Sequence, residues 1–468
     1  MLRLFSIIIL LTSYIFSSYA INGAEHSTKG VVNYSGTIPV LFIDTENNTP
    51  ITSKTQYISA SLWLDPMGND EIEAVGTRTE PLALQIRGRG HSSWNSPKKP
   101  YKLKLSSKTS LMGMPKNKHW ALLKPSESIV AGLQLGKLMN MAWTPDFRPV
   151  EVVLNGNYIG LYFLTETIRI DKNRVNIYEQ NDGETDPELI KGGWLVEVDN
   201  YHDDCQIIIR ENVNWNLTLK YHSPEVLSSI QSQWLSNEFR TINSAIYSTD
   251  KTSTEWEKYI DVESMAKYFI IQEVMDNPDG FHGSFYLHKD LQEGSKWVAG
   301  PIWDPLCYNR EKTDYTFKMK VHYGFTPHWI GEIIQYDSFC QAVSKAWEEI
   351  YPTKLSLLYE YIDHTILPLG PAWSNDSERW NEDASRTAEF RARNIKYGIE
   401  RNIEWFDSNL PISPHSSVHA ISSIENDEQV KVYNLQGMTI GKFNTLEDAR
   451  SVLKTGIYIV NGKKIKLN

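Results

Sequence analysis

The stretch LQIRGRGHSSWNSPKKPYKLKL, residues 84–105, decides how the first part of this chain folds. Leu84 and Ile86 alternate with polar residues before an Arg-Gly-Arg-Gly turn, and a second alternating run, YKLKL, follows it. Because successive side chains of a strand point to opposite faces, this pattern predicts two strands that each have one apolar face. The second strand then presents two ammonium groups, those of Lys102 and Lys104, on its other face.

Charge is segregated around this stretch. Between Pro81 and Ser126 there are ten lysines and arginines and no acid, so the rest of the chain must carry −20 to reach the net charge of −10. Like charges gathered on one sheet repel each other unless an anion lies among them. The patch fits either a solvated strand face or a site for a polyphosphate, whose oxygens the arginines and flexible glycines can approach. Nucleic acid is a poor candidate, because the protein is acidic overall and carries an export signal.

The first twenty residues have the composition of a secretory signal peptide, which we place at 1–20. Arg3 gives a positive start, residues 4–16 are nearly all apolar, and SYA at 18–20 is a small-x-small cleavage site. No later apolar run approaches this length, so we expect a mature chain without a transmembrane span, secreted or associated with the cell surface. Three cysteines are too few for a disulfide framework.

Hydrophobic periodicity changes along the chain. Strand-like alternation dominates the first part, where Asn155-Gly156 marks the tight turn of a hairpin, and residues 129–142 have helical spacing weakened by two glycines. Helical spacing dominates the later part, over residues 224–247, 256–275, 338–349, 353–366 and 376–408, interrupted by two short strand-like runs. This order predicts an α+β protein with a β-rich lobe at about 30–180 and a helical lobe at about 220–410.

The end of the sequence differs in composition from the rest. A Pro- and Ser-rich linker is predicted at 411–424, followed by a small β module at 425–468. Such a module is marginal as an independent core, and we interpret it as a sorting or anchoring element.

Three aspartates flank the two short strands in the helical part. Asp276 and Asp279 precede SFYLHK, and Asp304 follows KWVAGPIW. Carboxylates placed in this way can converge on one hard cation, although turn geometry alone also favours Asp in an N-P-D-G turn such as that of Asp279. A basic cradle for phosphates and two loop aspartates for Mg²⁺ are together the parts that phosphoryl transfer requires.

Several long motifs in this order resemble those of the spore-coat protein H (CotH) kinase family. They are RGRGHSSWNSPKKPYKLKL, LMGMPKNKHWALL, FRPVEVVLNGNYIGLYFLTETIRIDKNRVNI, GGWLVEVDNY, MDNPDG with SFYLHKD, and GPIWD. The resemblance runs from about Ile38 to Leu410, within a kinase-like domain at 30–410. It implies a bilobal, atypical protein-kinase-like fold that uses ATP with Mg²⁺ or Mn²⁺ to phosphorylate Ser or Thr hydroxyls of surface or envelope proteins.

The resemblance also implies roles for individual residues. The RGRGHSSW turn would cover the phosphates of the nucleotide, through Arg87, Gly88, Arg89, Gly90, Ser92 and Ser93. A lysine of the following strand would reach the α- and β-phosphates, and we prefer Lys102 to Lys104. Asp279 would orient the acceptor hydroxyl, and Asp304 would bind the metal ion.

Four departures from the family pattern bear on activity. Leu306 stands where a second acid is common, and Pro305 before it removes a backbone donor. Ser284 stands where a kinase catalytic loop has a metal-binding Asn, and it would bind the metal ion in its place as a weaker ligand. The fourth departure is that the helix at 129–142 contains no acid to pair with the lysine and no Arg near its start. Glu127 or Glu166 would have to supply the missing carboxylate.

These departures keep a second hypothesis open. Positioning and electrostatics supply most of the catalysis in phosphoryl transfer, so a chain that lacks metal ligands can bind without turnover. The alternative is therefore a kinase-fold protein that holds a nucleotide or a partner surface. A third hypothesis, a carbohydrate-associated surface protein, rests only on the 15 Trp and 24 Tyr, and we favour large cores as their explanation.

Overall fold

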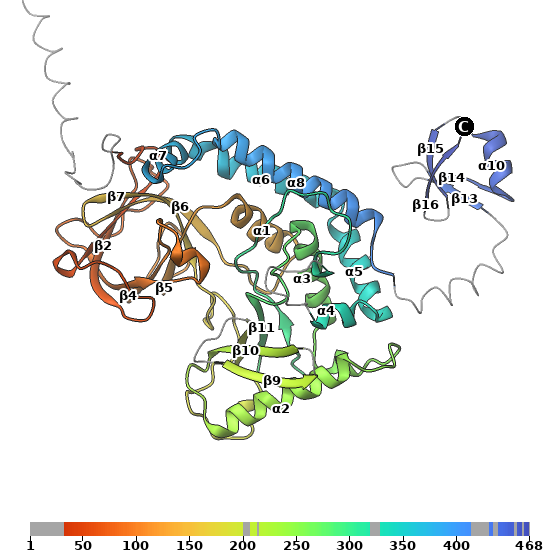
Figure 1. The fold of residues 1–468 in the computed structure, drawn as a ribbon, viewed down its shortest axis with the longest axis horizontal. Helices are drawn as coiled ribbons and strands as arrows, with labels where there is room; N and C mark the ends of the chain where they lie inside the picture. Colours follow the sequence, from red (N-terminus) through yellow and green to blue (C-terminus); the bar gives the residue numbers. More distant parts are fainter. Residues whose placement is uncertain are drawn as a thin grey trace, which may run out of the picture.

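The computed structural model describes residues 32–199, 206–212, 215–318, 328–412, 430–433, 439–453, 456–460 and 463–467. The predicted signal peptide and the linker from residue 413 lie outside these ranges. The described chain is α+β, as predicted, with a closed β-barrel in its first part and helices gathered in its later part (Figure 1). No helix within these ranges combines the length and the hydrophobicity that a membrane crossing requires.

Seven strands close into the barrel in the order β1-β2-β3-β4-β5-β7-β6. Their bounds are β1 Val40–Thr45, β2 Ile58–Asp65, β3 Leu82–Gly88, β4 Tyr101–Thr109, β5 Asn117–Leu123, β6 Phe147–Leu154 and β7 Asn157–Glu166. The basic stretch forms β3 and β4, which pair antiparallel with Arg87 opposite Lys102, so the two predicted strands are confirmed. Ile86, Leu103 and Trp120 belong to the core that fills the barrel. The lysines of β4 alternate with this core and therefore point to the outside of the barrel.

β6 and β7 form the predicted hairpin, and β6 also pairs parallel to β1, which closes the barrel. Asn155 and Gly156 both have positive φ, 50° and 75°, as the tight turn of an Asn-Gly hairpin requires. On the outside of the barrel, Ala121 and Phe163 belong to the large core that also contains the helices. Ala121 lies opposite Lys102 in the β4–β5 ladder, so the barrel packs against the helical part through the face that carries this lysine.

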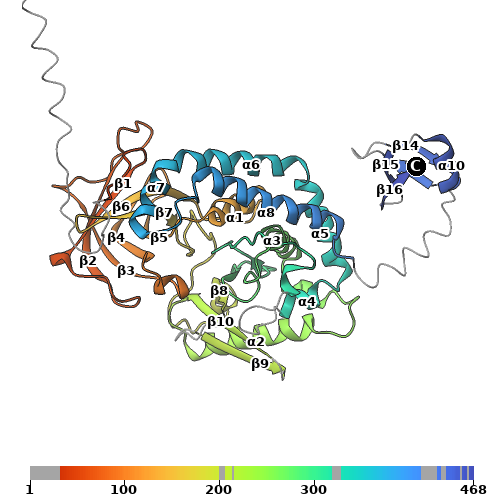
Figure 2. The same ribbon diagram turned by 45° about the horizontal axis from the view of Figure 1, so that its top comes forward.

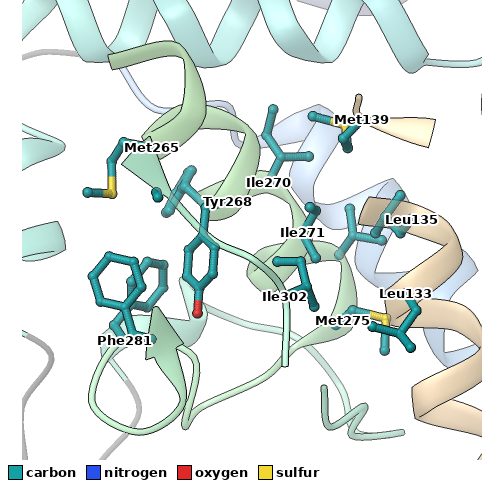
Figure 3. Packing of buried hydrophobic residues seen from close by; sticks show 14 of the residues in the cluster. Leu133, Leu135, Met139, Met265, Tyr268, Ile270, Ile271, Met275, Phe281 and Ile302 are labelled. Atoms are coloured by element: carbon teal, nitrogen blue, oxygen red, sulfur yellow. The ribbon is translucent and has the colours of Figure 1, made fainter. Parts of the chain in front are cut away.

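The helix α1 (Glu127–Leu138) follows β5 and begins two residues before the predicted start. Figure 3 shows Leu133 of α1 beside Met275 at the end of α3, with Ile302 next to them. Gly132, which weakens the helix by propensity, lies where Pro305 comes closest, and a Cβ at this position would collide with the proline ring. The glycine therefore allows the segment around residues 302–305 to pack directly on the helix.

A second sheet has the order β12-β11-β8-β10-β9, with bounds β8 Trp194–Val198, β9 Gln206–Asn212, β10 Trp215–Ser223, β11 Phe285–Lys289 and β12 Val298–Ala299. β11 and β12 are the two strand-like runs of the predicted helical lobe, whereas no strand was predicted for β8 to β10. Val196 and Leu219 share the large core with residues of α2. Glu197 and Tyr286 lie opposite each other in the ladder, on the other face of the sheet.

The remaining helices of this part are α2 Ser229–Ile246, α3 Val262–Met275, α4 His328–Ile333, α5 Asp337–Ile350, α6 Thr353–Ile366, α7 Gly370–Trp380 and α8 Ala388–Ser408. The single helix predicted over 376–408 is wrong, because it consists of two helices. α7 ends where Asn381 adopts a left-handed conformation, φ 53°, and Thr387 caps the start of α8 by accepting from the Phe390 N–H. The break lets α7 contact β7 while α8 runs along α3 and α6 (Figure 2).

The C-terminal strands form their own four-stranded sheet in the order β14-β13-β15-β16. The elements are β13 Val430–Tyr433, β14 Thr439–Phe443, α10 Leu446–Val452, β15 Gly456–Val460 and β16 Lys463–Leu467. β15 and β16 pair antiparallel, and the Asn461-Gly462 pair between them lies outside the described residues. Val432, Ala449 and Val460 form the small core of this sheet.

Tryptophan side chains are prominent in the cores. The largest fully buried side chains include Trp120, Trp194, Trp256, Trp297 and Trp347. Core packing therefore explains much of the high aromatic content, and no exposed stacking surface is needed to account for it.

Candidate active site

Asp304 follows β12 and is held in place by α1. Its backbone has φ 48°, a left-handed conformation that Asp tolerates better than most residues. The next residue, Pro305, is buried against Gly132. A helical glycine and a proline thus fix the chain directly after Asp304, while Asp304 itself remains exposed.

The Arg89 guanidinium reaches this aspartate from the barrel. It lies over the Trp303 ring, 5.3 Å from the ring centroid. Burial lowers the pKa of Arg89, and the negative charges of Asp304 and Glu197 oppose this effect. The guanidinium makes no hydrogen bond or ion pair with any residue of the described chain. A half-buried cation without a hydrogen-bond acceptor in the described chain thus lies near Asp304.

Asp304 is one of three carboxylates gathered here. Burial raises the pKa of the Asp304 carboxyl because surrounding protein atoms remove much of its water, although part of the residue is exposed. Arg89 acts to lower this pKa, whereas the nearby Asp279 and Glu197 raise it further. The charges of Arg89 and Asp279, which come from segments far apart in the chain, thus both act on the pKa of Asp304.

Asp279 lies in a turn that buried side chains build. The side-chain oxygen of Asn277 accepts from the Asp279 N–H at 3.2 Å, and the Tyr268 hydroxyl donates to the Gly280 oxygen at 2.5 Å. The side chain of Asp279 is 46% exposed, and its Oδ1 lies 3.4 Å from Nε2 of His282. The turn thus holds the backbone rigidly and leaves the carboxylate accessible to a ligand.

Asp276 does not take part in this group, contrary to the expectation that three aspartates converge on one cation. It is fully buried at the end of α3, where Arg310 Nε lies 2.7 Å from Oδ2 and Lys312 Nζ lies 3.3 Å from Oδ1. Lys312 also pairs with Glu273 at 2.8 Å. These ion pairs compensate the charge of Asp276, so its role is structural.

Lys102 and Lys104 have different surroundings, although both point outward from β4. Burial lowers the pKa of Lys102 to about 8, with further contributions from Arg87 and Arg169. Lys102 makes no hydrogen bond or ion pair within the described chain. Lys104 is exposed. Arg89 also contributes to the lowered pKa of Lys102, so this lysine belongs to the same charged environment as the Arg89 guanidinium.

The glycines of the RGRG turn are covered by side chains of the same loop. Ser92 and Ser93 lie in a short 3-10 helix, Ser92–Asn95, that follows the turn. A Cβ at Gly88 would collide with the ring of Trp94, and one at Gly90, where φ is 85°, would collide with the hydroxyl of Ser93. In this structure the glycines make room for the loop itself, and the Arg87 guanidinium is bonded to the Lys54 carbonyl oxygen.

The two glutamates considered as partners of the lysine are engaged elsewhere. Glu166 is buried, accepts from the Asp146 N–H at 3.0 Å and lies 3.7 Å from Arg174 Nε. Burial raises the pKa of Glu166. Glu127 faces Arg386 and Arg391, both at 3.4 Å. Neither glutamate pairs with Lys102, and the acid whose charge acts on this lysine is Glu225, which forms no ion pair with it in the described chain.

Ser284, predicted as a metal ligand, stands at the start of β11. It is half-buried and has φ 53°, a left-handed conformation that is uncommon for Ser. Its neighbour along β11, Tyr286, faces Glu197. Ser284 thus directly precedes the strand that carries Tyr286, and no contact in the described chain assigns it a ligand role.

Two acidic residues, Glu197 in β8 and Asp199 directly after it, were not predicted as site residues from the sequence. Glu197 is nearly buried and lies 2.7 Å from Nε2 of His222. Although burial acts to raise the pKa of Glu197, the hydrogen bond and the charge of His222 lower it. Asp199, also buried, lies 3.8 Å from both His91 of the RGRG loop and Lys220. The signal in the sequence was two acids within the apolar run WLVEVD, since buried charge is costly unless it is used.

Within the described ranges, no three His, Cys, Asp or Glu side chains are arranged to hold a metal ion among themselves. Mg²⁺ is commonly held by one or two carboxylates together with phosphate oxygens and water. The accumulated charge of Asp279, Asp304 and Glu197 fits a divalent cation of this kind. Asp304 and Asp279 would hold it, and the ion would neutralise charge on a bound phosphate.

Cations from a β-rich part beside loop aspartates of a helical part are among the features that phosphoryl transfer requires. The pattern of the family described as CotH kinase protein matches residues 86–406, which is most of the chain. The chain therefore belongs to the CotH kinase family, and the predicted resemblance is confirmed. No curated protein matched the chain significantly.

Proposed function

We propose that this chain is an exported, atypical protein kinase that uses ATP and Mg²⁺ or Mn²⁺ to phosphorylate Ser or Thr hydroxyls of surface or envelope proteins. Its barrel and its helical part would be the two lobes of a kinase-like fold. The nucleotide's phosphates would lie between the cations of the barrel and the carboxylates of the loops around β11 and β12.

The observation that carries this proposal is that two half-buried cations have no partner in the described chain. Arg89 and Lys102 both have a pKa lowered by burial, and neither makes a hydrogen bond or an ion pair in the described chain. A polar group that gives up water without gaining a partner destabilises the fold. Phosphate oxygens would supply the missing acceptors, bidentate for the guanidinium and as a point charge for the ammonium.

The two aspartates would have different roles in the transfer. Asp304 would bind the metal ion, because among the acids its charge acts most strongly on the pKa of Arg89 and because it is the aspartate of the GPIWD motif. Asp279 would orient the acceptor hydroxyl and accept its proton, since its carboxylate is accessible on a rigid turn. The acceptor would be a protein outside the cytoplasm, because the sequence begins with a predicted signal peptide.

A second candidate function is nucleotide or partner binding without turnover. It is favoured by Leu306 and Ser284, which stand where the family pattern has an acid and an Asn, and by the lack of a three-ligand metal group in the described ranges. Fewer protein ligands weaken the hold on the metal ion, on which charge neutralisation in the transition state depends.

Binding and transfer are measured separately to distinguish these candidates. ATP affinity is measured by calorimetry with Mn²⁺ or Mg²⁺, and transfer by incorporation of labelled γ-phosphate into the chain or into an acceptor protein. The kinase proposal expects both, with Lys102→Met weakening ATP binding and Lys104→Met, on the same strand, leaving it unchanged. Incorporation that Asp304→Ala does not alter refutes the site, and ATP binding without any incorporation favours the second candidate.

A further inference from the structure

Lys98 belongs to the basic stretch but does not face solvent. Its side chain is buried, and Nζ donates to the Leu161 oxygen at 2.7 Å and to Oδ1 of Asp376 at 2.5 Å. The same ammonium lies 4.9 Å from the centroid of the Tyr162 ring. Asp376 is a residue of α7, so the loop between β3 and β4 is bonded to a helix 278 positions further along the chain.

Asp376 is built into the barrel at the same point. Its Oδ1 also accepts from the Leu161 N–H at 3.0 Å, and Gly160, with φ 103°, leaves the space that this carboxylate occupies. Two more side chains of α7 donate to carbonyl oxygens of β7, Arg379 Nε to Tyr158 at 2.9 Å and Trp380 Nε1 to Ile159 at 3.1 Å. α7 is thus fastened along the beginning of β7.

The ion pair is sensitive to the loss of either member. Burial lowers the pKa of Lys98 and raises that of Asp376, and in each case the partner's charge opposes the effect. Removing one member of a buried pair leaves an uncompensated charge, which is far more destabilising than replacing both members.

The loop that Lys98 anchors is the loop that carries Arg89. The Arg89 N–H donates to the Pro100 oxygen at 3.2 Å, and the Tyr162 hydroxyl donates to the Lys99 oxygen at 2.9 Å. The C-terminal end of the loop, next to Lys98, is therefore bonded to β7. The N-terminal end of the loop, at Arg89, is bonded to that C-terminal end.

We propose that Lys98 and Asp376 are positioning residues that tether the loop at 88–100 to α7 and so set where Arg89 stands relative to Asp304. The consequence for nucleotide binding rests on the proposed function, whereas the tether itself does not. α7 and the arginine that faces phosphate would then move as one body.

The test compares three variants of the mature chain. Asp376→Asn leaves Lys98 charged and poorly compensated, and Lys98→Met with Asp376→Leu replaces the buried pair by apolar side chains. The control is Lys396→Met with Asp363→Leu, a more exposed ion pair of 2.6 Å that joins α8 to α6. Hydrogen exchange of the amides at 88–100, the thermal midpoint and the Kd for ATP with Mn²⁺ are measured for each.

We expect Asp376→Asn to exchange the loop amides about tenfold faster and to raise the Kd for ATP about tenfold. The apolar double variant should recover the thermal midpoint but neither loop protection nor ATP affinity, because the directed bonds to Leu161 are gone. The control should change neither. If the apolar double variant recovers loop protection from hydrogen exchange and ATP affinity together with the thermal midpoint, the ion pair only fills space. That result would refute the proposed tether. A wild type that binds no ATP, while Asp376→Asn loses loop protection, would refute the proposed function and leave the tether standing.

Discussion

Replacing Lys102 by Met tests whether this lysine destabilises the fold in the absence of a ligand. Burial lowers its pKa from an ordinary 10.5 to about 8, and a tenfold loss of proton affinity corresponds to about 1.4 kcal/mol. The charged side chain therefore destabilises the folded state by at most about 3 kcal/mol. Lys102 is only half-buried, and solvent screening reduces this figure. We expect Lys102→Met to raise the free energy of unfolding at pH 7 by about 1 to 2 kcal/mol.

The direction of the pKa shift also fixes the pH dependence of stability. Below pH 8 the lysine is charged in both the folded and the unfolded chain, so the difference between wild type and Lys102→Met is constant. Between pH 8 and 10.5 the unfolded chain holds this proton and the folded chain has lost it. Wild type therefore gains stability relative to the variant as the pH rises through this window.

Urea unfolding of wild type, Lys102→Met and Lys104→Met at pH 7 and about pH 9.5 measures both effects. Lys104 is the control because it is exposed on the same strand. ATP affinity, measured on the same samples at pH 7, should fall by about 10- to 100-fold for Lys102→Met, as expected for the loss of a charge-assisted hydrogen bond. A Lys102→Met variant that is no more stable than Lys104→Met would refute the claim that the ammonium is desolvated and unpaired.

Three further predictions concern the aspartates and the helix behind them. Asp304→Asn should abolish the dependence of ATP affinity on Mn²⁺, measured against EDTA, without lowering the thermal midpoint, because the fold already raises the pKa of this carboxyl. Asp279→Asn should lower phosphoryl transfer about 100-fold with little change in ATP affinity, and an equal loss of both would contradict a role in orienting the acceptor. Gly132→Ala should destabilise the chain by about 1 to 3 kcal/mol, because its Cβ collides with Pro305. Gly398→Ala in α8, where the nearest atom to a Cβ is 3.6 Å away, should be neutral or stabilise by up to about 1 kcal/mol in the same urea assay, and equal effects of the two would exclude the Pro305 contact.

Local sequence patterns were sufficient to predict the strands around the RGRG turn and the hairpin at Asn155-Gly156. Alternation and turn chemistry are properties of neighbouring residues, so a single sequence shows them. Barrel closure could not be predicted, because it depends on the parallel pairing of β1 with β6, where Val40 lies opposite Glu151. The break between α7 and α8 was missed because apolar spacing continues across it, while Asn381 ends α7.

The site was predictable where chemistry is written in a motif, and not where it depends on packing. Arg89 and Asp304 stand in motifs and could therefore be selected from the sequence as candidates. Lys102 and Lys104 alternate identically along β4, and only the folded chain shows that one is desolvated and the other exposed. Glu197 was not selected from the sequence, because its surroundings arise only when the second sheet places Tyr286 and His222 against it.

Pro305 departs from the family pattern, but it has a structural role in this chain. Its ring fills the space that Gly132 leaves open on α1, so the proline and the glycine that weakens the helix explain each other. Together they fix the chain directly after Asp304, whose left-handed backbone is otherwise unfavourable. In the proposed function, Leu306 in place of a second acid would leave less of the phosphate charge to be neutralised through a protein-held metal ion, and Arg89 and Lys102 would have to neutralise more of it. Neither of these two cations has a hydrogen-bond or ion-pair partner in the described chain, and the proposed function therefore depends on them as much as on the metal ion.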